Sequence, residues 1–226
     1  MKQKNDTIKT IFLVDDHPIV RRGIRQIISG EEDMEVYGEA SNADEALQLL
    51  EHLKPDVVVT DLSMAGKSGI GLIKDILARL PRQAILVLSI HNDALHAERA
   101  LKAGAKGYIT KQDAPDLIVT ALQKIAAGEI YICESVAHKL LATILPATGK
   151  KLRQPGKTPS VSALSDRELE ILELIGQGLG TSRIAKKLNI SVNTVETHRA
   201  HIKAKLQLPD ASALTVFAVQ YVTSAS

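Results

Sequence analysis

Three aspartates are the side chains in this sequence whose types and spacing could do chemistry. Asp15 and Asp16 directly follow one apolar run, and Asp61 follows another. If these carboxylates meet in the fold, they repel one another unless a cation lies between them or a pKa rises. Mg²⁺, a hard cation with oxygen ligands, is the usual solution beside phosphate. Ser89 and Lys111 could then hydrogen-bond phosphoryl oxygens, and Asp61 could be a nucleophile that forms an acyl phosphate.

The elements that must position these residues are short strands that alternate with helices. The predicted strands are 10–14, 36–40, 57–60, 84–89 and 107–110, and the predicted helices are 17–30, 42–53, 69–80, 93–104 and 115–127. This alternation indicates βαβ units, and hence a parallel sheet with helices on both faces. Five such units predict an α/β, flavodoxin-like (βα)5 doubly wound domain. Because these folds bind ligands at the carboxyl ends of their strands, the five side chains are expected to meet there.

Each of these residue types also has an ordinary structural role. An aspartate after a strand can cap the next helix or occupy a turn, and a serine or lysine there can simply face solvent. The occurrence of all five at predicted strand ends favours the functional interpretation. His17 and His91 lie nearby in the sequence, and we interpret both as surface residues rather than ligands.

Four segments resemble the signature segments of response-regulator receiver domains. They are Leu13 to Pro18 (LVDDHP), Asp56 to Asp61 (DVVVTD), Val87 to Ser89 (VLS) and Gly104 to Lys111 (GAKGYITK). The resemblance covers about residues 8–127. It implies that Asp61 accepts phosphate from the phosphohistidine of a sensor histidine kinase. It also implies no enzyme activity beyond the domain's own phosphoryl transfer and slow dephosphorylation.

The resemblance assigns roles to the residues around the acceptor. The implied Mg²⁺ ligands are Asp16, Asp61, the backbone carbonyl of Ser63 and, partly through water, Asp15. The implied residues that handle the phosphoryl group are Ser89, Lys111 and the switch residue Tyr108, whose ring swings inward. The family commonly has Met-Pro beyond the acceptor, where this chain has Met64-Ala65. The missing proline predicts a more mobile loop after Asp61, which bears on the lifetime of the phosphorylated form.

The rest of the chain is predicted to be helical after a linker. A short helix at 134–145 precedes a flexible linker rich in proline, glycine and basic residues from Pro146 to Ser162. The expected helices and their caps are 166–176 with a capping box of Ser165 and Glu168, 181–189 capped by Thr181, a helix to 206 capped by Ser191 or Asn193, and one from Pro209-Asp210 to about Tyr221. The expected domains are 8–127, a helix and linker at 128–163, and an all-α four-helix helix-turn-helix domain at 164–226.

Helix 193–206 is the predicted recognition helix. At 100° per residue, Val195, Ile202 and Leu206 share the face that packs, and small or polar residues occupy the opposite face. A face of small residues lets a helix approach base edges, while flanking basic residues reach phosphates. The predicted DNA contacts are Asn193, Thr194, Glu196, Thr197, Arg199, Ala200 and Lys203. A metal site at His198 and His201 is not expected, because no cysteine or third ligand accompanies them.

A second resemblance supports this interpretation. The segments Leu164 to Glu168 (LSDRE), Gly178 to Ala185 (GLGTSRIA) and Thr194 to Arg199 (TVETHR), ending in Lys205-Leu206, are similar to the LuxR/FixJ-type helix-turn-helix over about 157–222. A receiver joined to this module resembles the NarL/FixJ family of response regulators. Many members have lysine in place of Glu196, so their operator sequences do not transfer to this chain.

Charge separates the two halves of the chain. Residues 147–226 carry eleven Lys or Arg against six Asp or Glu, a balance of +5, which leaves −3 for residues 1–146. This asymmetry favours a polyanion partner for the second half only. Phe217 and Tyr221 are the only aromatic side chains after residue 131. Because single-strand binders stack bases on aromatics, double-stranded DNA is the expected partner.

Two other classes of protein remain open at this point. An aspartyl-phosphate hydrolase also uses an aspartate nucleophile and Mg²⁺, but it usually carries a second aspartate where this chain has Ser63. A signalling scaffold could use the last domain to bind protein, since helix pairs dock partners as well as DNA. The basic balance and the small-residue face favour DNA.

The remaining expectations concern location and assembly. The lone Cys133 is interpreted as a buried small hydrophobe, compatible with a reducing cytoplasm, and no segment is long and apolar enough for a membrane span. A cytoplasmic protein is therefore expected. Because one recognition helix reads only a few base pairs, a homodimer when phosphorylated is predicted. RNA polymerase is the expected further partner.

Overall fold

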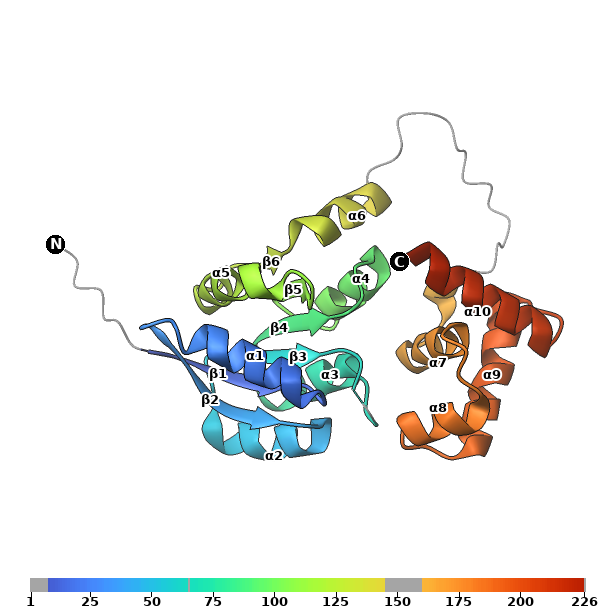
Figure 1. Cartoon of the computed structure of the whole chain (residues 1–226), viewed down its shortest axis with the longest axis horizontal. Helices are drawn as coiled ribbons and strands as arrows, with labels where there is room; N and C mark the ends of the chain where they lie inside the picture. The colour runs from blue at the N-terminus through green and yellow to red at the C-terminus, as the bar shows by residue number, and fades with distance from the viewer. Residues whose placement is uncertain (1–7, 65, 145–159, 226) are drawn as a thin grey trace. The chain divides into compact units, whose positions relative to one another are not determined.

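The computed structural model describes residues 8–64, 66–144 and 160–225 (Figure 1). The chain divides into two compact units, Met1–Leu140 and Leu141–Ser226, which are described separately below. Ala65 and most of the predicted linker lie outside the described residues. Within the described part of the chain, no helix has both the length and the apolar character of a membrane span.

The first unit is built on a parallel sheet. Its strands are β1 (Lys9–Val14), β2 (Met34–Ala40), β3 (Val57–Asp61), β4 (Ala84–Ser89), β5 (Gly107–Thr110) and β6 (Tyr131–Ile132). They lie in the order β2-β1-β3-β4-β5-β6, and every neighbouring pair is parallel. The predicted α/β doubly wound fold is confirmed. The sixth strand was not predicted, because two residues are too few to show a strand periodicity.

Helices cover both faces of this sheet. They are α1 (Pro18–Ile28), α2 (Ala43–Leu53), α3 (Gly69–Arg79), α4 (Ala94–Lys102), α5 (Ala114–Ala126) and α6 (Glu134–Ile144). α1 packs beside α5, while α2, α3 and α4 follow one another on the other face (Figure 1). Every residue of β3 is buried, as expected for a central parallel strand between two helical layers.

The strand order reverses next to β1. The chain passes from β1 outward to β2 and then returns across β1 to β3, so the switch lies between β1 and β3. Val14 pairs with Thr60 at the ends of these two strands. The next residues along each strand are therefore Asp15 and Asp61, at the crevice where doubly wound folds bind ligands.

The second unit is helical. It contains a 3-10 turn η1 (Val161–Ala163) and the helices α7 (Asp166–Gly176), α8 (Thr181–Lys187), α9 (Val192–Leu206) and α10 (Ala211–Ala225). The predicted capping box is confirmed, since the Ser165 side chain accepts from the Glu168 amide and Glu168 accepts from the Ser165 amide. Ser191, one of the two expected caps of α9, accepts from the Thr194 amide at 3.0 Å.

Two details of these helices differ from prediction. The cap of α8 is Gly180, not Thr181, because Thr181 is the first helical residue and its hydroxyl donates to Glu196 instead. α10 continues to Ala225, beyond the predicted end at Tyr221. The Thr223 hydroxyl donates to the Val219 carbonyl within this last part of the helix.

Val195, Ile202 and Leu206 form the buried stripe of α9, as predicted, with exposures of 0, 0 and 1%. They share one hydrophobic core with residues of α7, α8 and α10. This packing leaves the opposite face of α9 exposed.

Candidate phosphoacceptor site and nucleic-acid interface

The predicted acidic site is assembled at the carboxyl ends of β1, β3 and β5. Asp61 is 1% exposed and Asp15 is 4% exposed. Lys111, which follows β5, places its ammonium nitrogen 2.7 Å from Oδ2 of Asp61 and 2.7 Å from Oδ2 of Asp15. Its backbone amide donates to the Ser89 carbonyl at 2.7 Å, so the end of β4 fixes its position.

Burial and charge set the protonation of this site. Burial raises the pKa of Asp61, the Lys111 ammonium opposes that shift, and the Asp15 carboxylate adds to it. Burial disfavours the charged form of Lys111, but Asp61 and Asp15 together raise the pKa of its ammonium above the ordinary value. One ammonium between two buried carboxylates leaves an excess of negative charge. That donor set suits a divalent cation with oxygen ligands.

Asp16 and His17 border the same site. The Nδ1 atom of His17 lies 2.8 Å from Oδ1 of Asp16 and 3.1 Å from Oδ1 of Asp15. The His17 side chain is 63% exposed, as expected for a surface residue. Ligand atoms of these three residues and of Asp61 all lie within 4.8 Å of one another. The fold therefore brings the predicted carboxylates together and adds a histidine at their solvent side.

Two serines border Asp61. The Ser63 amide donates to Oδ1 of Asp61 at 3.1 Å, and the Ser63 hydroxyl lies 3.2 Å from Nε2 of His91. Ser89 is fully buried at the end of β4, and its hydroxyl oxygen accepts from the His91 amide at 3.1 Å. His91 thus connects the loops that follow β3 and β4.

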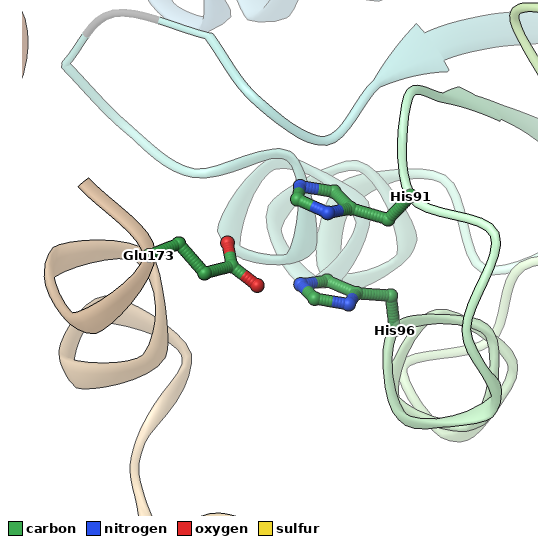
Figure 2. A group of neighbouring side chains, drawn as sticks. All are labelled: His91, His96 and Glu173. Carbon is green, nitrogen blue, oxygen red and sulfur yellow. The ribbon is translucent and has the colours of Figure 1, made fainter. Parts of the chain in front are cut away.

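Tyr108 is fully buried, and its hydroxyl donates to the His91 carbonyl at 2.7 Å. The tyrosine ring therefore occupies an inward position. The imidazole of His91 stacks on that of His96, with centroids 3.9 Å apart and planes 4° from parallel (Figure 2). The interpretation of His91 as a plain surface residue is wrong, because the tertiary structure places a second ring and a serine against it.

Two residues that support the site were missed from the sequence. Arg21 of α1 donates from Nη1 to the Asp15 carbonyl at 2.5 Å and pairs through Nε with Glu39 at 3.1 Å. Gly69, at the start of α3, lies so close to the end of β3 that an added Cβ would be 2.2 Å from the Asp61 carbonyl oxygen. Neither role could be recognised from the local sequence, since an arginine or a glycine near a helix start can have many structural roles.

In the second unit, α9 presents most of the predicted DNA contacts to solvent. The exposed members are Asn193, Thr194, Glu196, Thr197 and Ala200, and the partly buried members are Arg199 and Lys203. α8 and α9 are consecutive helices joined by a short turn and lie against each other (Figure 1). This is the arrangement of a helix-turn-helix.

Glu196 is held by its neighbours rather than left free on α9. The Thr181 hydroxyl of α8 donates to its Oε1 at 2.7 Å, and the Arg199 guanidinium lies 3.7 Å from its Oε2. The carboxylate is therefore turned toward the amino end of α8.

Comparison with known protein families gives two matches that agree with these two sites. The response regulator receiver domain model matches residues 11–123, and the model of bacterial regulatory proteins of the luxR family matches residues 162–218. The chain belongs to the NarL/FixJ family of response regulators. The predicted family is confirmed, and this response regulator regulates transcription through its LuxR-type DNA-binding domain.

Relatives of this response regulator align along nearly the whole chain. The nitrate/nitrite response regulator protein NarL of Escherichia coli K12 is 36% identical over 204 residues, covering 90% of this chain and 92% of NarL. The oxygen regulatory protein NreC of Staphylococcus epidermidis is 38% identical over 212 residues, covering 93% and 96%.

A solved structure of similar architecture has DNA bound. It is RcsB from Salmonella enterica serovar Typhimurium, bound to promoter P1flhDC in the presence of the phosphomimetic BeF3⁻. RcsB is 31% identical to this response regulator, with a TM-score of 0.65 and coverage of 96% and 98% of the two chains.

Proposed function

We propose that Asp61 is the phosphoacceptor and that a sensor histidine kinase supplies the phosphoryl group. The observation that carries this proposal is the position of the Lys111 ammonium, 2.7 Å from carboxylate oxygens of both Asp61 and Asp15. A carboxylate oxygen of Asp61 attacks phosphorus as the bond from phosphorus to the kinase imidazole breaks. The imidazole keeps the bonding electron pair and takes up a proton, and Asp61 becomes an acyl phosphate.

Mg²⁺ fits the carboxylates of this site. Its proposed ligands are Asp15, partly through water, Asp16, Asp61 and the Ser63 backbone carbonyl. When bound, Mg²⁺ supplies charge neutralisation for the carboxylates and the phosphoryl oxygens. Asp15 is itself oriented by the bond from Arg21 to its backbone carbonyl.

Lys111 and Ser89 hold the phosphoryl group after transfer. The Lys111 ammonium already bridges two carboxylates and can exchange one of these contacts for a phosphoryl oxygen. Ser89 is the last residue of β4. Its hydroxyl can donate a hydrogen bond to a phosphoryl oxygen while it still accepts one from the His91 amide. The position of Tyr108 depends on the conformation of the loop that follows β4, because its hydroxyl donates a hydrogen bond to the His91 carbonyl. Apart from its own phosphoryl transfer and slow dephosphorylation, the domain is proposed to have no enzyme activity.

The second unit reads double-stranded DNA with α9 in the major groove. Asn193, Thr197 and Ala200 approach the base edges, and Thr194, Arg199 and Lys203 contact the backbone. Glu196, held toward α8, lies at the edge of this surface. Phosphorylation is proposed to promote a homodimer whose two recognition helices read half-sites one helical turn apart. Recruitment of RNA polymerase by the bound dimer is part of the same proposal.

The phosphoacceptor is tested by labelling with a small phosphodonor and Mg²⁺. The full-length protein should gain one acid-stable, base-labile phosphoryl group, and Asp61→Asn should gain none. Asp56→Asn, which alters another aspartate at a loop before β3, serves as a matched control and should still be labelled. Undiminished labelling of Asp61→Asn contradicts the assignment.

Assembly on DNA is tested by light scattering of the phosphorylated protein with a duplex selected for binding. Two protein chains per duplex are expected for the wild type. Asp61→Asn under the same conditions should give fewer dimeric complexes. A complex of one chain per duplex at saturating protein argues decisively against the proposed dimer.

A further inference from the structure

Two histidines of α9 and one glutamate of α7 lie together in the DNA-binding unit. His198 and His201 are three residues apart on α9, and therefore lie on one side of that helix. Glu168, in the first turn of α7, faces them, and ligand atoms of all three residues lie within 4.8 Å of one another. The sequence shows two histidines without a third ligand, and the packing of α7 on α9 supplies it.

We propose that this α7–α9 cluster (Glu168, His198 and His201) binds a divalent transition-metal ion of the zinc class. Two imidazoles and one carboxylate are a donor set that zinc takes in proteins, with water as the fourth ligand. Imidazole ligands favour Zn²⁺ or Co²⁺ over Mg²⁺, so this cluster, with two imidazoles and one carboxylate, differs chemically from the receiver site, which has three carboxylates and one exposed histidine.

The distances within the cluster suit a shared ion. Oε1 of Glu168 lies 3.9 Å from Nδ1 of His201, which is too far for a hydrogen bond. Two ligand atoms at about 2.1 Å from one ion, at a tetrahedral angle, are roughly 3.4 Å apart. A small rotation of the His201 side chain, which is 59% exposed, closes the difference.

The other oxygen of Glu168 is already held. Oε2 accepts from the Ser165 amide at 2.7 Å and from Lys205 at 2.6 Å, and the side chain is only 5% exposed. These bonds fix the carboxylate and leave Oε1 turned toward the histidines. The bond from the Ser165 amide is the kind of outer hydrogen bond that orients a ligating carboxylate in a metal site.

His198 carries the strongest sign of an absent partner. Its Nδ1 atom is buried and has no hydrogen-bond partner among the described residues. A buried nitrogen of this kind normally has one.

Lys205 is the group that opposes metal binding, because its ammonium adds positive charge next to Glu168. Its side chain is 40% exposed, so it can turn into solvent when an ion arrives. Lys205 and the metal ion therefore compete for Glu168. Removing the positive charge with Lys205→Met should strengthen metal binding, whereas a substitution that only damaged the fold would weaken it.

The test is a titration of the full-length protein with Co²⁺, which reports its ligands through visible absorption. Excess Mg²⁺ is present throughout, so that the carboxylate site of the receiver does not take up Co²⁺. The wild type is expected to show the intense absorption of four-coordinate Co²⁺, saturating at one equivalent. His201→Ala and Glu168→Gln should each weaken Co²⁺ binding at least tenfold. Glu168→Gln is chosen because glutamine also completes a capping box.

Two control variants separate this cluster from other histidines. His138→Ala, on α6, removes an exposed histidine and should leave the titration unchanged. His91→Ala disrupts the stacked pair of the receiver and should also leave it unchanged. Circular dichroism of each variant checks that the helices remain. Lys205→Met should bind Co²⁺ more tightly than the wild type.

Three results overturn the proposal. The first is a wild-type spectrum that shows only the weak absorption of six-coordinate aqueous Co²⁺. The second is an unchanged titration in His201→Ala with the helical signal intact. The third is loss of the absorption in His91→Ala alone, which would assign the metal to the receiver histidines.

Discussion

The ammonium nitrogen of Lys111 is equidistant, at 2.7 Å, from a carboxylate oxygen of Asp61 and one of Asp15. All three side chains are at least 86% buried. One positive charge therefore faces two negative charges in a region with little water. Partly unpaired buried charge is costly, so the receiver carries an electrostatic strain at Asp61 and Asp15.

Relief of that strain gives a prediction for Asp61→Asn. Burial raises the pKa of Asp61. The folded receiver is therefore more stable at low pH, and it loses stability as pH rises through the raised pKa of Asp61. Without Mg²⁺ at pH 7.5, Asp61→Asn should therefore unfold at a higher temperature than the wild type. The advantage should shrink as pH falls through the raised pKa and be lost by about pH 4. Thermal unfolding in EDTA measures both.

Added Mg²⁺ provides the complementary result. It should raise the Tm of the wild type more than that of Asp61→Asn, because the variant has lost one carboxylate ligand. Equal Mg²⁺ effects on the two proteins, or a less stable Asp61→Asn in EDTA, speak against the charge imbalance.

Gly69 should tolerate no side chain. A Cβ there would lie 2.2 Å from the Asp61 carbonyl oxygen and 2.5 Å from the Leu62 Cα, so backbone must shift. Gly69→Ala should cost about 1–3 kcal/mol of receiver stability and slow phosphorylation of Asp61. Gly71→Ala in the same helix is the control, since its Cβ would meet the flexible Lys67 side chain at 3.4 Å and the Ser68 hydroxyl at 3.5 Å, which are ordinary contacts with side chains rather than clashes with backbone. It should be stabilising by about 0.5–1 kcal/mol in urea unfolding. Equal effects of Gly69→Ala and Gly71→Ala on receiver stability would contradict the predicted clash at Gly69.

Asp93 should make receiver stability depend on acid pH. Burial alone raises the pKa of Asp93, but the hydrogen bonds and charge of His96 outweigh it and lower the pKa to about 2. A depressed pKa contributes stability above the unfolded value, and that stability is lost as pH falls from about 4 through 2. Asp93→Asn, which keeps a capping oxygen, should cost at most about 2 kcal/mol at pH 6 and about half of that near pH 3.

Asp93→Ala separates the cap from the charge. The Asp93 side chain accepts from the His96 amide at 3.0 Å as the N-cap of α4. Its loss should add about 1 kcal/mol of destabilisation at both pH values. Urea unfolding at pH 6 and pH 3 measures these differences. A cost of Asp93→Asn that does not change with pH contradicts the role of the charge.

The small-residue face of α9 should set DNA affinity. Ala200→Glu places a bulky negative side chain on that face and should weaken binding at least tenfold without unfolding α9, because Ala200 is exposed. Lys203→Ala should reduce the slope of log affinity against log salt by about 0.9, the value for one phosphate contact. Lys102→Ala, on α4 of the receiver, is the control and should leave the slope unchanged. Fluorescence anisotropy at several salt concentrations provides the readout. An unaltered affinity in Ala200→Glu places the DNA elsewhere.

Local pattern was enough for much of this molecule. The predicted strand at 107–110 and its four counterparts agree with the structure, because apolar runs bounded by turn residues carry their own signal. The capping box of Ser165 and Glu168 needs only residues three apart. Asp15, Asp61 and Lys111 could be placed together because all parallel strands end at the same edge of a sheet.

Contacts that depend on the path of the chain through a loop were decided only by the tertiary structure. Asp61 precedes Gly69 by a few residues, but no local pattern shows that its carbonyl will lie against Gly69. Likewise, the stacking of His91 on His96 depends on how the loop after β4 folds back toward α4. Such contacts depend on packing and chain path, which no periodicity encodes.

Glu168 has one role that the local sequence determines and another that the tertiary structure determines. Its place in the capping box follows from its spacing after Ser165, because a helix start is a local structure. Its place beside His198 and His201 depends on α7 packing across α9. The sequence by itself determined the elements and the residues that end them, since both depend on neighbours a few positions away. The tertiary structure decided which of those residues meet, because burying the apolar faces of separate elements brings together side chains whose sequence separation carries no information about distance.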